Sequence, residues 1–87
     1  MKLNPDFILR EIAGEAILVP VGGAAAASGM IVLNETGADI WKHLNENCDR
    51  GFALKKMTEE YDADEKAIAA DLDAFIDDLK SKRVILD

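Results

Sequence analysis

The sequence predicts a single α+β domain of the winged helix-turn-helix type, in which a three-stranded antiparallel sheet precedes three helices. Three observations support this fold class. The first third of the chain is rich in β-branched residues and glycine, whereas the part from Glu35 onward is charged and has helical periodicity. No stretch is long enough to link two domains. Because 49% of the 87 residues are hydrophobic, we expect residues 1–87 to share one core.

Three short segments have the residue types of β-strands. Phe7–Ile12 and Glu15–Pro20 are separated by an alanine–glycine pair, which suits a tight hairpin turn. Residues 30–33 form a third apolar segment after a Gly/Ala loop at residues 22–29, which we expect to be a mobile hairpin tip. Together the segments predict an antiparallel meander whose third strand lies at one edge.

Three helices are predicted by their caps and by apolar residues that recur every three or four positions. Asn34 is a good N-cap for the first helix, because its side-chain oxygen can accept from a free N–H group of the first turn. The second helix is expected over residues 52–61 and the third over residues 65–83. Their inward faces share the helical spacing and comprise Gly37, Ile40, Trp41 and Leu44, then Leu54, Met57 and Tyr61, then Ile68, Leu72, Phe75, Ile76 and Leu79. The apolar residues 84–86 are expected to form a last strand or to pack against the core.

Residues that could support catalysis or metal binding are sparse. His43 and Cys48 are the single histidine and cysteine, and neither has a sequence neighbour that would activate it. The segment 62–65 reads Asp-Ala-Asp-Glu and lacks the glycine and the closing-glutamate spacing of a calcium loop. The glycines of residues 22–29 are not spaced as in a phosphate-binding loop. We therefore expect no enzyme activity, no catalytic residues, no cofactor and no metal.

The charge balance argues against a nucleic-acid partner. The chain has 17 acidic and 10 basic side chains and a net charge of −7, whereas nucleic-acid-binding domains collect Lys and Arg to neutralise phosphates. The sequence shows no signal peptide, no apolar stretch of membrane length and no second cysteine. These features predict a cytoplasmic protein without a membrane partner.

A candidate binding site comes from shape rather than from reactive groups. An edge strand leaves N–H and C=O groups unpaired and can template an added strand. Beside the apolar face of the third helix runs a row of small or acidic residues, namely Ala67, Asp71, Ala74 and Asp78. The alanines would let another chain come close, and the carboxylates would favour a ligand that carries Lys or Arg. The same row also fits an ordinary solvent-exposed helix face, where alanine is simply a good helix former.

Residues 31–41 carry the most recognisable pattern of the chain. They read Ile-Val-Leu-Asn-Glu-Thr-Gly-Ala-Asp-Ile-Trp, which resembles the LN-x-T-G-A-x-I-W signature of the PqqD-like family. Residues 71–79 resemble the D-V-x-x-F-L-x-x-L pattern of that family's third helix, and residues 84–86 resemble its apolar ending. The resemblance covers nearly the whole chain.

The resemblance implies a non-catalytic peptide-binding adaptor, the recognition element of a ribosomally made peptide pathway. Such an element holds the leader segment of a precursor peptide for a modifying enzyme, with the leader beside the third strand and against the third helix. Carried over to this chain, the peptide-binding residues would be Met30, Ile31, Val32, Leu33, Ala67, Asp71, Ala74 and Phe75. Residues of the matching signature would be structural, namely Asn34, Thr36, Gly37 and Trp41.

One departure from the family pattern bears on the pathway. Residues 18–21 and the Gly/Ala loop stand where the quinone-pathway members carry a Y-P-E element. This difference favours a modified peptide other than the pyrroloquinoline quinone precursor, with a radical S-adenosylmethionine enzyme as partner by analogy with the family. Two alternatives remain open: a DNA-binding winged-helix regulator, which the acidic helices disfavour, and a structural module that forms a homodimer through its open strand edge.

Overall fold

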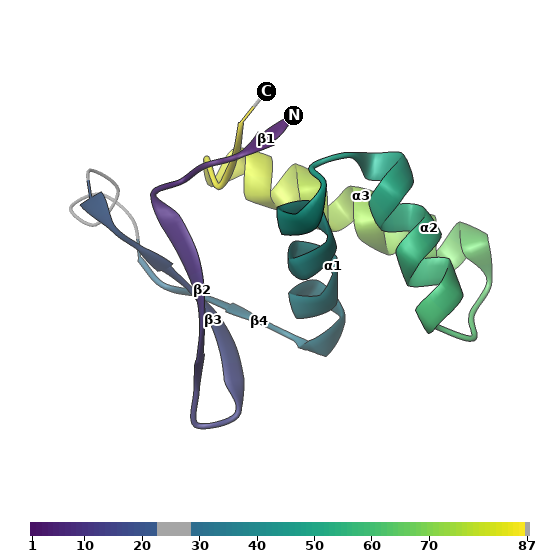
Figure 1. The fold of residues 1–87 in the computed structure, drawn as a ribbon, viewed down its shortest axis with the longest axis horizontal. Helices are drawn as coiled ribbons and strands as arrows, with labels where there is room; N and C mark the ends of the chain where they lie inside the picture. The colour runs from purple at the N-terminus through teal and green to yellow at the C-terminus, as the bar shows by residue number, and fades with distance from the viewer. Residues whose placement is uncertain (23–28, 87) are drawn as a thin grey trace.

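The computed structural model describes residues 1–22 and 29–86, and its helices and sheet lie side by side (Figure 1). A three-stranded antiparallel sheet has the order β2-β3-β4, made of β2 (Phe7–Ile12), β3 (Glu15–Pro20) and β4 (Ile31–Leu33). Three helices follow, namely α1 (Glu35–Glu46), α2 (Arg50–Glu60) and α3 (Glu65–Ser81). The predicted α+β fold class and the edge position of the third strand are confirmed.

The two ends of the chain form a second, two-stranded sheet. β1 (Lys2–Leu3), which the sequence did not predict, pairs antiparallel with β5 (Ile85–Leu86), and both lie at the same end of the molecule (Figure 1). Asn4 fixes this pairing, because its backbone N–H donates to the Val84 carbonyl at 2.8 Å and its side-chain amide donates to the Arg83 carbonyl at 2.9 Å. Since Val84 is fully buried, the apolar ending is both a strand and a part of the core.

The β2–β3 hairpin turns through Ala13 and Gly14, whose φ angles are 53° and 82°. Positive φ at both central residues is typical of a type I′ turn, which matches the twist of a two-residue hairpin. The register pairs Ile12 with Glu15 across this turn, so the predicted tight turn is confirmed. The mobile tip expected within residues 22–29 falls largely on residues 23–28, which lie outside the described residues.

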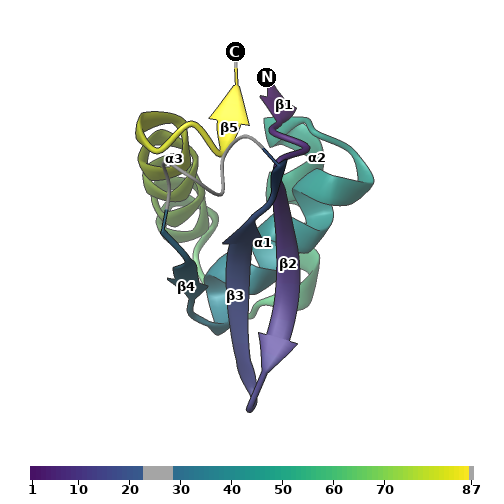
Figure 2. The ribbon, with the colours of Figure 1, turned by 90° about the vertical axis from the view of Figure 1, so that its left-hand side faces the viewer.

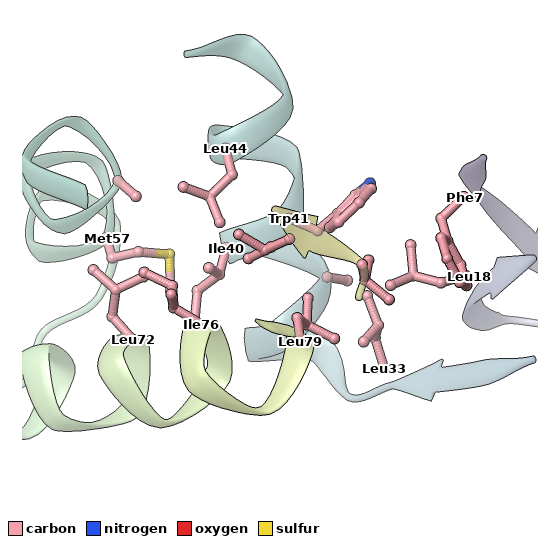
Figure 3. Packing of buried hydrophobic residues seen from close by; sticks show 14 of the residues in the cluster. Phe7, Leu18, Leu33, Ile40, Trp41, Leu44, Met57, Leu72, Ile76 and Leu79 are labelled. Atoms are coloured by element: carbon pink, nitrogen blue, oxygen red, sulfur yellow. The ribbon is translucent and has the colours of Figure 1, made fainter. Parts of the chain in front are cut away.

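One apolar core joins the sheet to the helices and to the C-terminal strand (Figure 3). Its labelled members are buried side chains from both layers: Phe7, Leu18, Leu33, Ile40, Trp41, Leu44, Met57, Leu72, Ile76 and Leu79. Trp41 is only 4% exposed, which confirms that it anchors the interior. Met57 of α2 is buried as predicted, whereas Leu54 of the same helix and Tyr61, which follows the helix, are half-buried.

Local signals set the helix ends that differ from the predicted bounds. α2 begins at Arg50 rather than at residue 52, because the Asp49 carboxylate accepts from the Phe52 N–H at 2.9 Å and caps the helix. α3 ends at Ser81 rather than at residue 83, because Arg83 has a φ of 61° and this left-handed conformation ends a helix. Within the described ranges, no helix has the length and apolar character needed to cross a membrane.

Candidate functional site

The sheet register determines which backbone groups of β4 remain free. In an antiparallel pair, residues that bond one neighbour alternate with residues whose backbone groups face the opposite side. The Val21 N–H donates to the Asp6 carbonyl at 2.7 Å, so the odd-numbered positions of β3 bond toward β2. Pro20, which pairs with Phe7, agrees with this alternation because it has no N–H to donate. The even-numbered positions of β3 therefore face β4.

The same alternation singles out one residue of β4. Ala16 and Leu18, which face β4, pair with Leu33 and Ile31 respectively. The backbone groups of Leu33 and Ile31 are therefore directed at β3. It follows that the N–H and C=O of Val32 point away from β3, into the open edge of the sheet.

Beside this edge, a groove runs along α3 and the first turn of α1, and Figure 2 shows β4 and α3 on the same side of the molecule. One pocket of about 270 Å³ is lined by Asn34, Thr36, Gly37, Ile40, Asp71, Ala74 and Phe75. A second pocket of about 90 Å³ is lined by Thr36, Ile40, Met57, Tyr61, Ala63, Ala67, Ile68 and Asp71. Thr36, Ile40 and Asp71 belong to both sets, so the pockets form one continuous depression, which we call the α3 groove. It begins directly after β4, because Asn34 follows that strand.

The structure brings the helix residues predicted from the sequence together in one place. The α3 groove is lined by all four of them: Ala67, Asp71, Ala74 and Phe75. The strand residues differ from one another. Val32 is 62% exposed, Ile31 is half-buried, and Met30 is 66% exposed but precedes β4 instead of belonging to it. Leu33 is buried in the core, so its side chain is not accessible to a ligand.

Residues expected to be structural also shape the α3 groove. Asn34 Oδ1 accepts from the Gly37 N–H at 2.7 Å and caps α1. A Cβ atom on Gly37 would lie 3.1 Å from Cε1 of Phe75 and 3.1 Å from Asn34 Oδ1. Glycine at this position therefore lets the Phe75 ring approach the first turn of α1. The signature spacing was visible in the sequence, but its role in the groove wall depends on how α1 packs against α3.

A hydrogen bond is made by Tyr61, which lines the part of the α3 groove away from β4. The Tyr61 hydroxyl donates to Asp39 Oδ2 at 2.5 Å and so joins the end of α2 to α1. The pKa of Tyr61 is raised above its usual value of about 10, and this bond is the largest cause. Burial also raises the pKa, whereas a hydrogen bond with Thr36 lowers it. The phenol therefore remains a protonated donor at neutral pH.

Asp71 is the charged group of the α3 groove. Its carboxylate is exposed and has no hydrogen bond or ion pair within the part of the chain that the structure describes. Asp78, which lies on the same face of α3, differs because it pairs with Lys82 at 2.9 Å. The negative charge of Asp71 is therefore available to a ligand.

The single histidine and the single cysteine lie outside the α3 groove. His43 Nε2 lies 2.5 Å from Glu60 Oε1, a contact that joins α1 to α2. Cys48 is a half-buried free thiol. Among the described residues, no three His, Cys, Asp or Glu side chains are placed to hold a metal ion. The β4 edge and the α3 groove together thus offer backbone groups, apolar surface and one carboxylate, which are features suited to binding an extended chain.

Comparisons with known proteins give the same architecture. A family model described as coenzyme PQQ synthesis protein D (PqqD) matches residues 15–85. The solved structure of TbiB1 in complex with the TbiA(beta) leader peptide is 22% identical, with a TM-score of 0.82 and 100% coverage of both chains. Lasso peptide synthetase B1 complexed with the leader peptide is 20% identical, with a TM-score of 0.81 over 99% of this chain and 96% of that chain. At these identities the likeness shows the fold. No curated protein sequence matches the chain.

Proposed function

We propose that this chain, which belongs to the family of coenzyme PQQ synthesis protein D, is a non-catalytic adaptor that holds the leader segment of a ribosomally made precursor peptide for a modifying enzyme. The observation that carries the proposal is the free backbone of Val32 at an apolar edge directly beside the α3 groove. The two structural relatives are complexes with leader peptides, which supports the same class of ligand here.

The binding mechanism is addition of a fourth strand to the sheet. One peptide residue exchanges hydrogen bonds with the N–H and C=O of Val32, and these bonds do not depend on the peptide's side chains. Side chains alternate along a strand. The two peptide residues that flank the partner of Val32 therefore point to the inner face of the sheet, which is the face of Ile31 and Leu33. Peptide residues that continue past Leu33 meet the α3 groove, where Phe75 and Asp71 contact their side chains and provide selectivity.

We propose that the complex of this chain with its precursor peptide has a modifying enzyme as partner, and that this enzyme acts on the bound precursor. A radical S-adenosylmethionine enzyme is the class we propose by analogy with the family. Residues 18–21 replace the Y-P-E element of the quinone-pathway members, which favours a precursor other than that of pyrroloquinoline quinone. A DNA-binding role is disfavoured, because α3 presents Asp71 and Asp77 to solvent and these carboxylates would repel phosphates.

Selection of peptides by the whole chain tests the proposal. The library displays random peptides of about 12 residues. At about 3.3 Å per residue, such a peptide is long enough to extend along both β4 and the α3 groove. We expect selected peptides, once synthesised, to bind in fluorescence anisotropy and to lose affinity with the Val32→Pro variant, which lacks the ladder donor. If no selected peptide depends on Val32, strand addition at β4 is wrong. If the chain instead self-associates through this edge, light scattering across concentration will show a homodimer.

A further inference from the structure

Among the described residues, Asp71 is the only charged side chain that lines the α3 groove, since the rest of the lining is uncharged. It lies in the wall that both pockets share. Ala67 and Ala74 flank it, one helical turn away in either direction. Their short side chains leave the Asp71 carboxylate uncovered. The groove therefore presents a single unpaired anion between small apolar residues.

An added strand would direct particular peptide side chains toward this carboxylate. The backbone of Val32 fixes the register of the added strand. The peptide residues on either side of the residue that bonds Val32 point to the inner face of the sheet. Past Leu33, that face continues into the pocket that contains Asn34, Phe75 and Asp71. Lys and Arg can lay their apolar stems over a ring such as that of Phe75 while the charged end reaches an anion.

We infer that the α3 groove selects peptides with a Lys or Arg at an inward-facing position, and this inference rests on the proposed function. The cationic end of that side chain pairs with the Asp71 carboxylate. A charge-assisted hydrogen bond of this kind is stronger than a neutral one. The net charge of −7 acts in the same direction, because a negative field attracts cationic peptides and raises their association rate. Asp71 is thus the residue of the site that selects for a cationic side chain.

Peptide selection on matched variants tests this inference. The same displayed library is selected against the wild-type chain, against Asp71→Asn and against Asp77→Asn. Asp77 is the control, because it is an exposed carboxylate on the same helix but lines a different pocket, together with Arg50 and Asp73. We expect Lys or Arg to be enriched at one peptide position with the wild type and Asp77→Asn, and not with Asp71→Asn.

Affinities of one selected peptide give the second readout. Asp71→Asn should weaken its binding about three- to tenfold, the range between an exposed ion pair and a charge-assisted bond, whereas Asp77→Asn should leave it unchanged. The charge-reversed pair, Asp71→Lys with the peptide cation replaced by Glu, should recover affinity.

The outcomes separate the inference from the proposed function. If selected peptides show no enrichment of Lys or Arg, or if both Asn variants weaken binding equally, the inference is overturned while strand addition stands. If no peptide depends on Val32, both are overturned.

Discussion

The sheet has two open edges, and charged side chains guard only one of them. Beside the β2 edge, Glu11 pairs with Lys42 at 3.4 Å, and Arg10 is also exposed. β4 contains no charged residue, and Val32 is 62% exposed. Natural sheets commonly guard their edges with charges, because an unguarded edge pairs with other chains. The unguarded edge of this protein is the one next to the α3 groove, and the proposed peptide binding would account for the difference.

The two edges also differ in what lies beside them. At the β2 edge, the Phe7 N–H already donates to the Asn4 carbonyl at 3.2 Å, and the neighbouring pocket includes Lys42 and Asn45. At the β4 edge, the lining of the neighbouring groove is apolar apart from Asn34, Thr36, Tyr61 and the carboxylate of Asp71. A few side chains therefore give the two edges of one small sheet different surroundings.

Proline substitutions on the two edges should give the largest difference. Val32→Pro should weaken binding of a selected peptide at least about tenfold, because a ladder bond contributes about 1 kcal/mol and its loss leaves a peptide carbonyl unsatisfied. Glu11→Pro is the matched control, because Glu11 pairs with Ala16 and its N–H also faces an open edge. We expect Glu11→Pro to bind normally in fluorescence anisotropy.

Both proline variants must keep the fold for this comparison. Circular dichroism should show the helical content of the wild type in each, and Val32→Thr, which retains the donor and the β-branched shape, should bind within about twofold of the wild type. Equal loss of binding in Val32→Pro and Glu11→Pro would contradict a special role for β4.

Tyr61→Phe should have the next largest effect, on stability. Loss of the hydrogen bond to the Asp39 carboxylate should lower the free energy of unfolding by about 1.5 kcal/mol, the value for a bond to a charged group. Because the pKa of Tyr61 is raised in the folded state, its contribution is present below pH 10 or so and is lost as the pH rises through the raised value.

The alkaline behaviour can be measured cleanly, because Tyr61 is the only tyrosine. Its ultraviolet titration in the folded protein should have a midpoint above about 10, and urea unfolding should show an alkaline loss of stability that is smaller in Tyr61→Phe. A midpoint at or below the ordinary tyrosine value would contradict the hydrogen bond between Tyr61 and Asp39.

Gly37→Ala should weaken peptide binding moderately and should change stability little. The new methyl group would push the Phe75 ring toward the pocket, and we expect about threefold weaker peptide binding from such a small steric shift. Stability should change by less than about 1 kcal/mol, because the better helix propensity of alanine offsets the crowding. Gly51→Ala, in the first turn of α2 and away from Phe75, is the control and should bind peptide normally.

Glu11→Val should have the smallest effect on stability but should alter the β2 edge. The exposed Glu11–Lys42 pair contributes less than about 1 kcal/mol, so the melting temperature should barely change. Without that charge, and with Ile12 already 52% exposed, the edge should allow self-association, seen as an apparent mass that rises with concentration in light scattering. A monomer at all concentrations would contradict a guarding role for Glu11.

The sequence predicted the elements whose signals are local. The hairpin turn is specified by the pair Ala13 and Gly14, and the start of α1 by Asn34, so both were predicted correctly. β1 was not predicted, because a two-residue strand has no periodicity and its partner, β5, lies at the opposite end of the chain. Only the folded chain brings Asn4 next to Val84.

The groove was predicted in part for the same reason. Ala67, Asp71 and Ala74 lie on one face of a helix, so helical spacing alone places them together. Thr36 and Gly37 were interpreted as structural, and their second role as groove lining arises from the packing of α1 against α3. That packing depends on the close approach of Phe75, which no local pattern specifies.

Amide exchange of Val32, followed by NMR with and without a selected peptide, tests strand addition at β4 most directly. The Val32 N–H points into the open edge, so it should exchange rapidly in the free protein and at least about tenfold more slowly in the complex. The Glu11 amide on the other edge should exchange equally fast in both. If the peptide is bound and the Val32 amide is not protected, strand addition at β4 is contradicted.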